Sequence, residues 1–407
     1  MKILVVVANC LKVNSSANLC HISYINGLID CGHEVDLLTV NDKGAVIDKD
    51  ITIPDVNNIY EYNGSVYDRL HKRKKTYISM KSKPIQNENN VKKSGLKNII
   101  SRLLIMVKKF IHDLYGVYET SIIWYNNAKK FKSKEEYDLV VSLSFPPTSH
   151  LMAIYLKNKK CVAAKRWIQI WEDPWSLDLV MNALRIQTLH KKEEKKLLDN
   201  ASEILYVSPL TLEYQKELFP ENATKMRWAP LPTYYQSKNN ELNFSELHFG
   251  YFGDYNSKVR NIVPFYNAMK NSGHKFTVCG ASDLNLVSDK NIDIYPRLPL
   301  SELSEHENKA NVLVFLCNLK GGQIPGKIYQ YSATNKFILF ILDGTDEEKI
   351  ILKEYFSKFN RYVFCDNNEA SIIDAIDFIK ANTEKAELFT PIDNFKPEKI
   401  IKQIIEG

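Results

Sequence analysis

The stretch NVLVFLCNLKGGQIPGKIYQYSATNKFILFIL, residues 311–342, decides the fold of this chain. It holds two apolar runs, Val312–Leu316 and Phe337–Leu342, that are typical of buried strands. Between them lie the pair Gly321-Gly322 and the tripeptide Pro325-Gly326-Lys327. Proline is favoured in the first turn of a helix, so a short helix is expected to begin there. Strand, glycine loop, helix and strand in this order predict a nucleotide-binding unit of an α/β sheet.

The same loop predicts a phosphate site. Glycines let the backbone come close to a ligand, and the unpaired N–H groups at a helix start favour an anion. Lys327 would add a mobile positive charge in the first turn. An ordinary strand-to-helix turn is the alternative, but the coincidence of glycines, Pro-Gly and lysine favours the phosphate.

The composition is that of a globular protein long enough for two domains. Of 407 residues, 44% are hydrophobic and 25% are charged, and no apolar run approaches the length of a membrane span. The start MKILVVVANC looks superficially like a signal peptide, but no cleavage site follows it and it suits a first strand. Seven scattered cysteines show no metal-ligand spacing and suggest reduced thiols. We therefore expect a cytoplasmic protein.

Positive charge is concentrated in one segment. Residues 68–136 hold 17 Lys and Arg against 6 Asp and Glu, which makes this segment +11 within a chain of net charge +6. Within it, residues 96–114 have apolar side chains at helical spacing and basic residues between them. A basic amphipathic helix over about 95–115 suits an anionic membrane surface, and a core-facing helix with a solvated basic side is the equal alternative. No nucleic-acid-binding module is recognisable, so nucleic acid is not an expected partner.

Both halves of the chain alternate strands and helices, which predicts two parallel α/β sheets. In the first half, a strand, the helix Ser16–Asp30 and the strand Glu34–Val40 form a βαβ unit. Residues 229–243 contain two prolines and a polar run, and the pattern restarts after them. We expect domains over 1–230 and 245–385, followed by a helical tail over 386–407. Two such halves would place a cleft between the carboxyl ends of their strands.

Five motifs are similar to those of a known family: GHEV at 32–35, SFPPTSH at 144–150, EDPW at 172–175, GYFG at 250–253 and IPGKIYQY at 324–331. Together they resemble family 4-like glycosyltransferases of the GT-B architecture, particularly bacterial enzymes of surface-polysaccharide assembly such as capsule and lipopolysaccharide. The resemblance runs from residue 1 to about 380. It implies two Rossmann-like doubly wound parallel-sheet domains facing an interdomain cleft, with a sugar nucleotide on the C-terminal half and a glycan or lipid-linked acceptor on the N-terminal half. It also implies hexosyl transfer with retention, without a metal or a cofactor, at the inner membrane face.

By position, the resemblance assigns residues to the donor. The expected donor contacts are Gly253, Lys258, Arg260, Gly322, Pro325, Gly326, Lys327 and Gln330. Of these, Arg260 and Lys327 are the expected catalytic cations, because electrostatic stabilisation of the departing diphosphate is the largest requirement of the reaction. The alternative for Arg260 is a solvated arginine on a helix face.

The chain departs from the family pattern at three donor positions. Gln330 stands where the family usually has a glutamate for the ribose hydroxyls, and an amide loses the charge-assisted clamp. Gly322 stands at the usual first glutamate, and Asp254 where many relatives carry a phosphate-binding arginine. These departures motivate a second hypothesis, a non-catalytic subunit that binds a sugar nucleotide. A sugar-nucleotide epimerase of the same architecture is a third.

Three residues of the first half are candidates for the acceptor side. Asp173 follows a strand and precedes a proline, so it can orient or deprotonate an acceptor hydroxyl, or simply cap a turn. His150 follows a proline-rich loop and is a candidate acceptor contact, although a structural histidine is the favoured alternative. Trp175 can stack on a sugar or pack in the core. The string Asp48-Lys49-Asp50 matches a metal-binding pattern, but it lies in a polar loop and is interpreted as chance.

Overall fold

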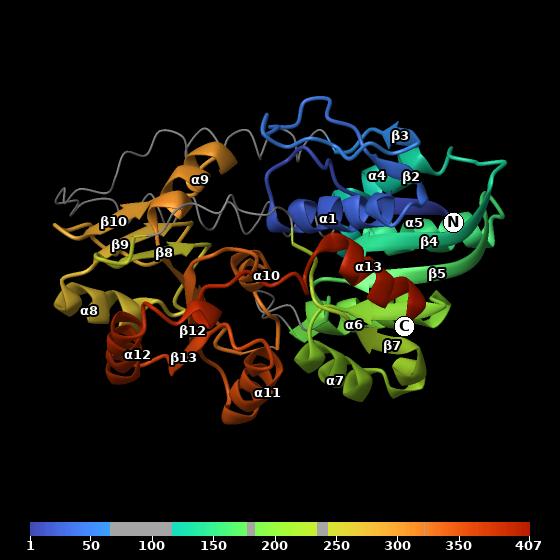
Figure 1. The fold of residues 1–407 in the computed structure, drawn as a ribbon. Helices are drawn as coiled ribbons and strands as arrows, with labels where there is room; N and C mark the ends of the chain where they lie inside the picture. Colours follow the sequence, from blue (N-terminus) through green and yellow to red (C-terminus); the bar gives the residue numbers. More distant parts are fainter. Residues whose placement is uncertain (66–115, 177–183, 234–242, 321) are drawn as a thin grey trace, which may run out of the picture.

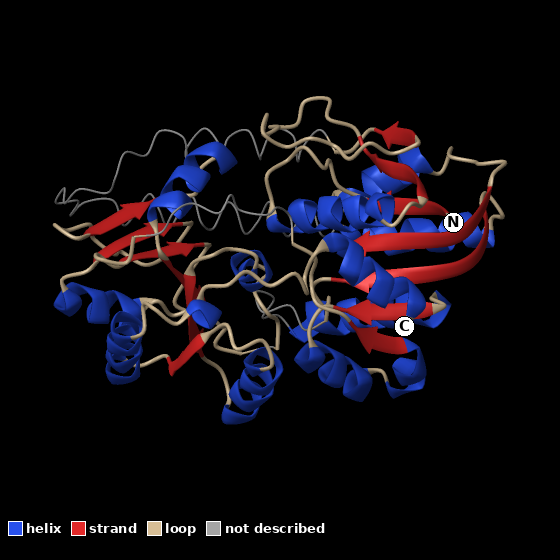
Figure 2. Ribbon diagram, in the orientation of Figure 1, coloured by secondary structure: helices blue, strands red, loops and turns tan. Residues whose placement is uncertain are grey.

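Two parallel sheets, each covered by helices, form two lobes that lie side by side (Figures 1 and 2). The computed structural model describes residues 1–65, 116–176, 184–233, 243–320 and 322–407. The N-terminal lobe contains a seven-stranded sheet of order β3-β2-β1-β4-β5-β6-β7, and the C-terminal lobe a six-stranded sheet of order β10-β9-β8-β11-β12-β13. The amphipathic segment expected over about 95–115 lies outside the described residues.

The N-terminal lobe is built on strands β1 (Lys2–Val7), β2 (Glu34–Val40), β3 (Asn58–Tyr62), β4 (Glu136–Ser144), β5 (Ala163–Trp171), β6 (Glu203–Tyr206) and β7 (Met226–Trp228). Its helices are α1 (Ser16–Asp30), α4 (Ser121–Ala128), α5 (Thr148–Asn158), α6 (Leu184–Asn200) and α7 (Pro209–Leu218), with 3₁₀ turns η1 (Gly116–Tyr118) and η2 (Pro220–Lys225). β1 pairs in parallel with β2 on one side and β4 on the other. The strand order therefore reverses beside β1, which opens a crevice at the carboxyl ends of these strands.

The C-terminal lobe repeats this plan with strands β8 (His248–Phe252), β9 (Lys275–Cys279), β10 (Ile292–Tyr295), β11 (Val312–Leu316), β12 (Phe337–Leu342) and β13 (Val363–Asp366). Its helices are α8 (Val263–Ser272), α9 (Leu300–Lys309), α10 (Lys327–Ser332), α11 (Asp346–Ser357) and α12 (Glu369–Ala381), with the 3₁₀ turn η3 (Ala386–Leu388). β8 pairs in parallel with β9 and β11, so the order reverses beside β8. The buried runs of β11 and β12 are apolar throughout because helices cover both faces of a parallel sheet.

The last helix, α13 (Pro397–Glu406), returns to the N-terminal lobe and packs against α1, so both chain ends lie in that lobe (Figure 1). Close approach requires a glycine: a Cβ at Gly27 would lie 2.5 Å from the carbonyl oxygen of Pro397. The carbonyl end of α13 is bound by two arginines, since Arg166 donates to the carbonyl of Ile405 and Arg227 to that of Gln403. Cations at this end of a helix are stabilising.

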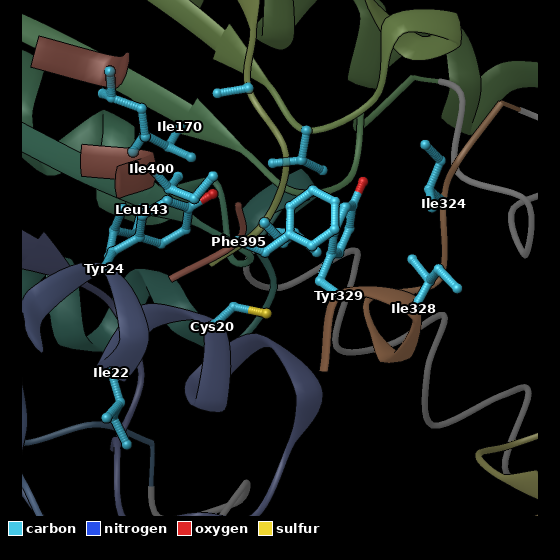
Figure 3. Packing of buried hydrophobic residues seen from close by; sticks show 14 of the residues in the cluster. Cys20, Ile22, Tyr24, Leu143, Ile170, Ile324, Ile328, Tyr329, Phe395 and Ile400 are labelled. Carbon is cyan, nitrogen blue, oxygen red and sulfur yellow. The ribbon is translucent and has the colours of Figure 1, made fainter. Parts of the chain in front are cut away.

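An apolar cluster joins the two lobes. Cys20 and Tyr24 of α1 belong to the same buried cluster as Tyr329 of α10 and Phe395, the residue that leads toward α13. Figure 3 shows Tyr329 and Phe395 side by side, and their ring centroids are 4.8 Å apart. The lobes are therefore in firm contact at this place. None of the helices formed by the described residues is long and apolar enough to cross a membrane.

Candidate functional site

The loop between β11 and α10 is docked on the N-terminal lobe. The carbonyl oxygen of Gly322 accepts hydrogen bonds from the hydroxyls of Ser208, at 2.5 Å, and Thr211, at 3.3 Å. Gly322 has φ +67°, and a Cβ there would lie 2.9 Å from both Leu210 and Tyr214. Glycine is required here by the contact between the lobes as well as by the backbone conformation. A ligand was expected to come close to the backbone at Gly322. In this structure, side chains of α7 occupy that space instead.

Lys327 opens α10 and is paired with a glutamate that the sequence did not indicate. Its Nζ lies 2.8 Å from Oε1 of Glu307 in the last turn of α9, with side-chain exposures of 28% and 13%. Gly326 is the N-cap, and a Cβ there would lie 3.1 Å from Leu231. Gln330 follows Lys327 by one turn and is half-buried, as Pro325 is. Because α10 has only six residues, its dipole is small and side-chain cations matter more for an anion.

Arg260 lies between the carboxyl ends of two neighbouring strands. Its Nε donates to Oδ1 of Asn318, which follows β11, at 2.8 Å, and its Nη1 donates to the carbonyl of Asp254, which follows β8, at 3.0 Å. These two bonds fix the guanidinium at the reversal point of the C-terminal sheet. Lys258 is exposed in the same loop. The alternative of a solvated arginine on a helix face is therefore wrong for Arg260, since it precedes α8 and is half-buried.

A second arginine reaches the edge of the same sheet from another loop. Asp254 stands where an arginine was expected from the resemblance, and its carboxylate is bound by the guanidinium of Arg297, which follows β10. The other carboxylate oxygen of Asp254 accepts from the backbone N–H of Ala281 at 2.9 Å. This edge thus holds an arginine that no sequence motif marked, in an ion pair with Asp254.

The N-terminal lobe has a cavity of about 490 Å³ at the carboxyl ends of β1, β2 and β4. Aromatic side chains and neutral polar groups line it. The lining residues are Ala8, Asn9, Cys10, Val13, Ser15, Ala17, Val40, Asn41, Ala45, Gly64, Ser65, Val117, Tyr118, Glu119, Thr120, Ser121, Trp124, Phe145, Pro146, Pro147, Thr148 and Trp175. Within this lining set, Glu119 alone has a charged side chain. We call this space the N-lobe cavity; its volume suits a small ligand.

Trp175 is held in the wall of the N-lobe cavity. Its ring lies against Tyr118, at 5.0 Å between centroids, and is stacked on His190 at 4.8 Å. The buried carboxylate of Glu194 accepts from the backbone N–H groups of Trp175, at 3.3 Å, and Ser176, at 2.7 Å. Burial raises the pKa of Glu194. The sequence did not reveal Glu194, because its partners come from a loop about twenty residues earlier.

His150 lies in the core, away from the N-lobe cavity. It is fully buried, its Nδ1 is 2.7 Å from the hydroxyl of Ser142, and its ring packs on Trp171 at 4.4 Å. Burial lowers the pKa of His150 well below its ordinary value, so the imidazole is neutral. The structural alternative fits this placement, and the expected acceptor contact does not, because no solvent-facing surface of the ring remains.

The two carboxylates after β5 lie in different surroundings. Asp173 is exposed, while Glu172 turns toward α1, where its Oε1 is 3.3 Å from Nε2 of the buried His21. Burial raises the pKa of Glu172. Asp173 does not line the N-lobe cavity, and it lies two residues beyond the carboxyl end of β5.

The two aspartates of the Asp48-Lys49-Asp50 string have structural partners. Asp48 accepts from Asn14 at 2.8 Å. Asp50 reaches the other lobe, where it accepts from the backbone N–H of Ser301 in the first turn of α9 at 3.2 Å. Among the described residues, no group of three or more His, Cys, Asp or Glu side chains is arranged to hold a metal ion.

Solved structures with the same architecture cover the whole chain. A sucrose-phosphate synthase from Thermosynechococcus elongatus matches with a TM-score of 0.58 and 14% identity, over 100% of this chain and 97% of the other. A glycosyltransferase from Rickettsia africae matches with a TM-score of 0.53 and 13% identity, over 100% and 97%. No protein-family model matches the chain, and a search of curated proteins finds no significant match. Identities this low speak for the fold alone. The chain has the GT-B fold of two doubly wound parallel sheets with flanking helices, as the resemblance implied.

Proposed function

We propose that the protein is a glycosyltransferase that moves a hexose from a nucleotide-sugar donor to a glycan acceptor. The observation that supports this most directly is the difference between the carboxyl ends of the two sheets. Two arginines lie at those of the C-terminal sheet, and a cavity lined by aromatic rings and a single charged side chain lies at those of the N-terminal sheet. Open α/β sheets bind ligands in the crevice outside the carboxyl ends of their strands. The chemistry of these two edges, rather than the fold, carries the proposal.

The C-terminal lobe would hold the donor. In the reaction, the bond between the anomeric carbon and the β-phosphate oxygen breaks, and the nucleoside diphosphate leaves with additional negative charge. The acceptor oxygen forms the new bond to the anomeric carbon, and its proton passes to the leaving phosphate or to solvent. Arg260, Arg297 and Lys327 would supply the compensating positive charge, so we propose a reaction that uses neither a metal nor a cofactor. The loops of Gly253, Pro325 and Gly326 would approach the phosphates, and Gln330 would contact the ribose with neutral hydrogen bonds.

The N-lobe cavity would hold the acceptor. A lining with little charge and several aromatic rings suits a sugar ring, whose C–H faces pack on aromatic side chains. Trp175 would form part of that wall, and Asp173 would orient the attacking hydroxyl. We further propose a lipid-linked acceptor in cell-surface polysaccharide assembly, transfer with retention, and peripheral binding of the basic segment 68–136 to an anionic membrane.

A thermal-shift screen with UDP, GDP, ADP and their sugar derivatives tests the donor proposal. A ligand that binds only the native state raises the melting temperature, so one nucleotide class should stand out. Incubation with the stabilising sugar nucleotide alone, then with glycan acceptors, separates the rivals. Conversion of the donor without an acceptor indicates an epimerase, and binding without any turnover indicates a non-catalytic subunit.

Replacement of Lys327 by alanine is expected to lower the rate of transfer by about tenfold. The effect is moderate because Glu307 already neutralises much of this charge at 2.8 Å. The measurement is kcat/KM with the donor found in the screen, with Lys309→Ala at the exposed end of α9 as the control. Equal rates in wild type and Lys327→Ala would remove Lys327 from the mechanism.

A larger side chain in the N-lobe cavity is expected to lower the rate of transfer to the acceptor but not the rate of donor hydrolysis. Ala17, in the first turn of α1, lines the cavity. Ala17→Phe should reduce transfer to the acceptor by about tenfold, since steric changes of this size in a pocket have such effects, while hydrolysis of the donor by water persists. Ser16→Phe is the matched control, because the neighbouring Ser16 is exposed outside the cavity lining. Equal loss of donor hydrolysis in Ala17→Phe would argue against this cavity as the acceptor site.

A further inference from the structure

The ion pair between Lys327 and Glu307 joins α9 and α10, the helices that precede and follow β11 in the chain. Lys327 begins α10, directly after the Pro325-Gly326 turn, and Glu307 lies in the last turn of α9. Both side chains are mostly buried, with 28% and 13% of their surface exposed. Water screens such a pair less than an ion pair on the open surface, so the carboxylate holds the ammonium group more strongly.

Glu307 is held in place from its backbone as well. The ammonium of Lys336, a residue only 2% exposed, donates to the carbonyl of Glu307. Burial lowers the pKa of Lys336 to about 8. At the other end of α9, Asp50 of the N-terminal lobe accepts from the N–H of Ser301. These two hydrogen bonds hold α9 near both of its ends and favour the position of the Glu307 carboxylate beside Lys327.

We propose that Glu307 is an internal competitor for the donor's diphosphate and sets the affinity of the site. This inference rests on the proposed donor site at Lys327. A phosphate group that approaches Lys327 meets a carboxylate that already occupies the ammonium group, and two anions in one site repel each other. Lys327 therefore contributes to diphosphate binding only the difference between two attractions: that of the ammonium group for the diphosphate and that of the ammonium group for Glu307. The pair therefore weakens donor binding and, by the same reasoning, speeds the release of the nucleoside diphosphate product.

The competition predicts that loss of a negative charge strengthens binding. Glu307→Gln keeps the size of the side chain and removes its charge. It should lower the Kd for inorganic pyrophosphate, and for the nucleoside diphosphate that the thermal-shift screen selects, by about five- to tenfold, the range of a partly buried ion pair. Calorimetric titration at fixed ionic strength measures this. Glu305→Gln is the matched control, since Glu305 lies on the same helix and is exposed. It should bind as the wild type does.

A double-mutant cycle with Lys327→Ala identifies the origin of any gain. In the Lys327→Ala background, Glu307→Gln should bring no improvement, because the competed cation is absent. Unchanged or weaker binding by Glu307→Gln alone, or a gain that persists without Lys327, would overturn the competitor role. If Lys327→Ala weakens binding while Glu307→Gln does not strengthen it, the donor site stands and only this inference fails. If none of the proteins binds either probe, both the inference and the donor site fail.

Discussion

Alanine in place of Arg260 is expected to lower the rate of sugar transfer by about 10²–10³-fold, the usual cost of losing one fixed donor to a developing negative charge. The guanidinium is held by Asn318 at 2.8 Å and by the carbonyl of Asp254 at 3.0 Å, so it is already oriented before a donor arrives. A fixed cation needs no reorganisation when the diphosphate leaves. For this reason, Arg260→Ala should lower the transfer rate more than Lys327→Ala does. The measurement is kcat with saturating donor.

The controls must distinguish a loss of catalysis from a loss of stability, because the hydrogen bonds of Arg260 also link two loops. Arg260→Lys keeps a charge but cannot make both bonds, and it should recover only part of the rate. Lys270→Ala on the exposed side of α8 tests a general effect of lost positive charge and should leave the rate unchanged. If Arg260→Ala melts at the wild-type temperature and retains full transfer, Arg260 has no part in the reaction.

Apolar periodicity predicted most of the sheet framework. The ends of α1, β2, β11 and β12 agree with the expected ones, because each of these segments is mostly buried and a glycine or a polar residue lies beside it in the sequence. The short edge strand β3 was not predicted. Its sequence, NIYEY, is exposed or half-buried at every position, so no apolar pattern distinguishes it from a loop.

The candidate site was predictable only where a motif follows a strand. Arg260 and the loop of Lys327 were found in this way. Glu307, by contrast, is one of several acidic residues in LSELSEHENK, and nothing local distinguishes it from its exposed neighbours. Arg297 and Ser208 act through partners that are 43 and 114 residues away in the chain. Such partners depend on how loops from different strands meet, which a single sequence does not contain.

Replacement by alanine is expected to have very different effects on stability at two glycines at the edge of the C-terminal sheet. A Cβ at Gly280, after β9, would lie 2.0 Å from the carbonyl oxygen of Gly253, after β8, so backbone would collide with backbone. Since neither side can yield by rotating a side chain, Gly280→Ala should destabilise the protein by about 3 kcal/mol. A Cβ at Gly253 would meet only the Tyr251 hydroxyl, at 3.7 Å, an ordinary contact.

Gly253→Ala is therefore expected to change the free energy of unfolding by less than about 1 kcal/mol and still to weaken donor binding several-fold, because an added methyl group keeps a phosphate from the backbone of this loop. Urea unfolding followed by circular dichroism measures the first quantity, and titration with the nucleoside diphosphate the second. Equal stability of the two variants would mean that the loops after β8 and β9 separate easily. Wild-type affinity in Gly253→Ala would instead place the diphosphate away from this loop, nearer to Lys327, since a methyl group at 253 can obstruct only a ligand that touches it.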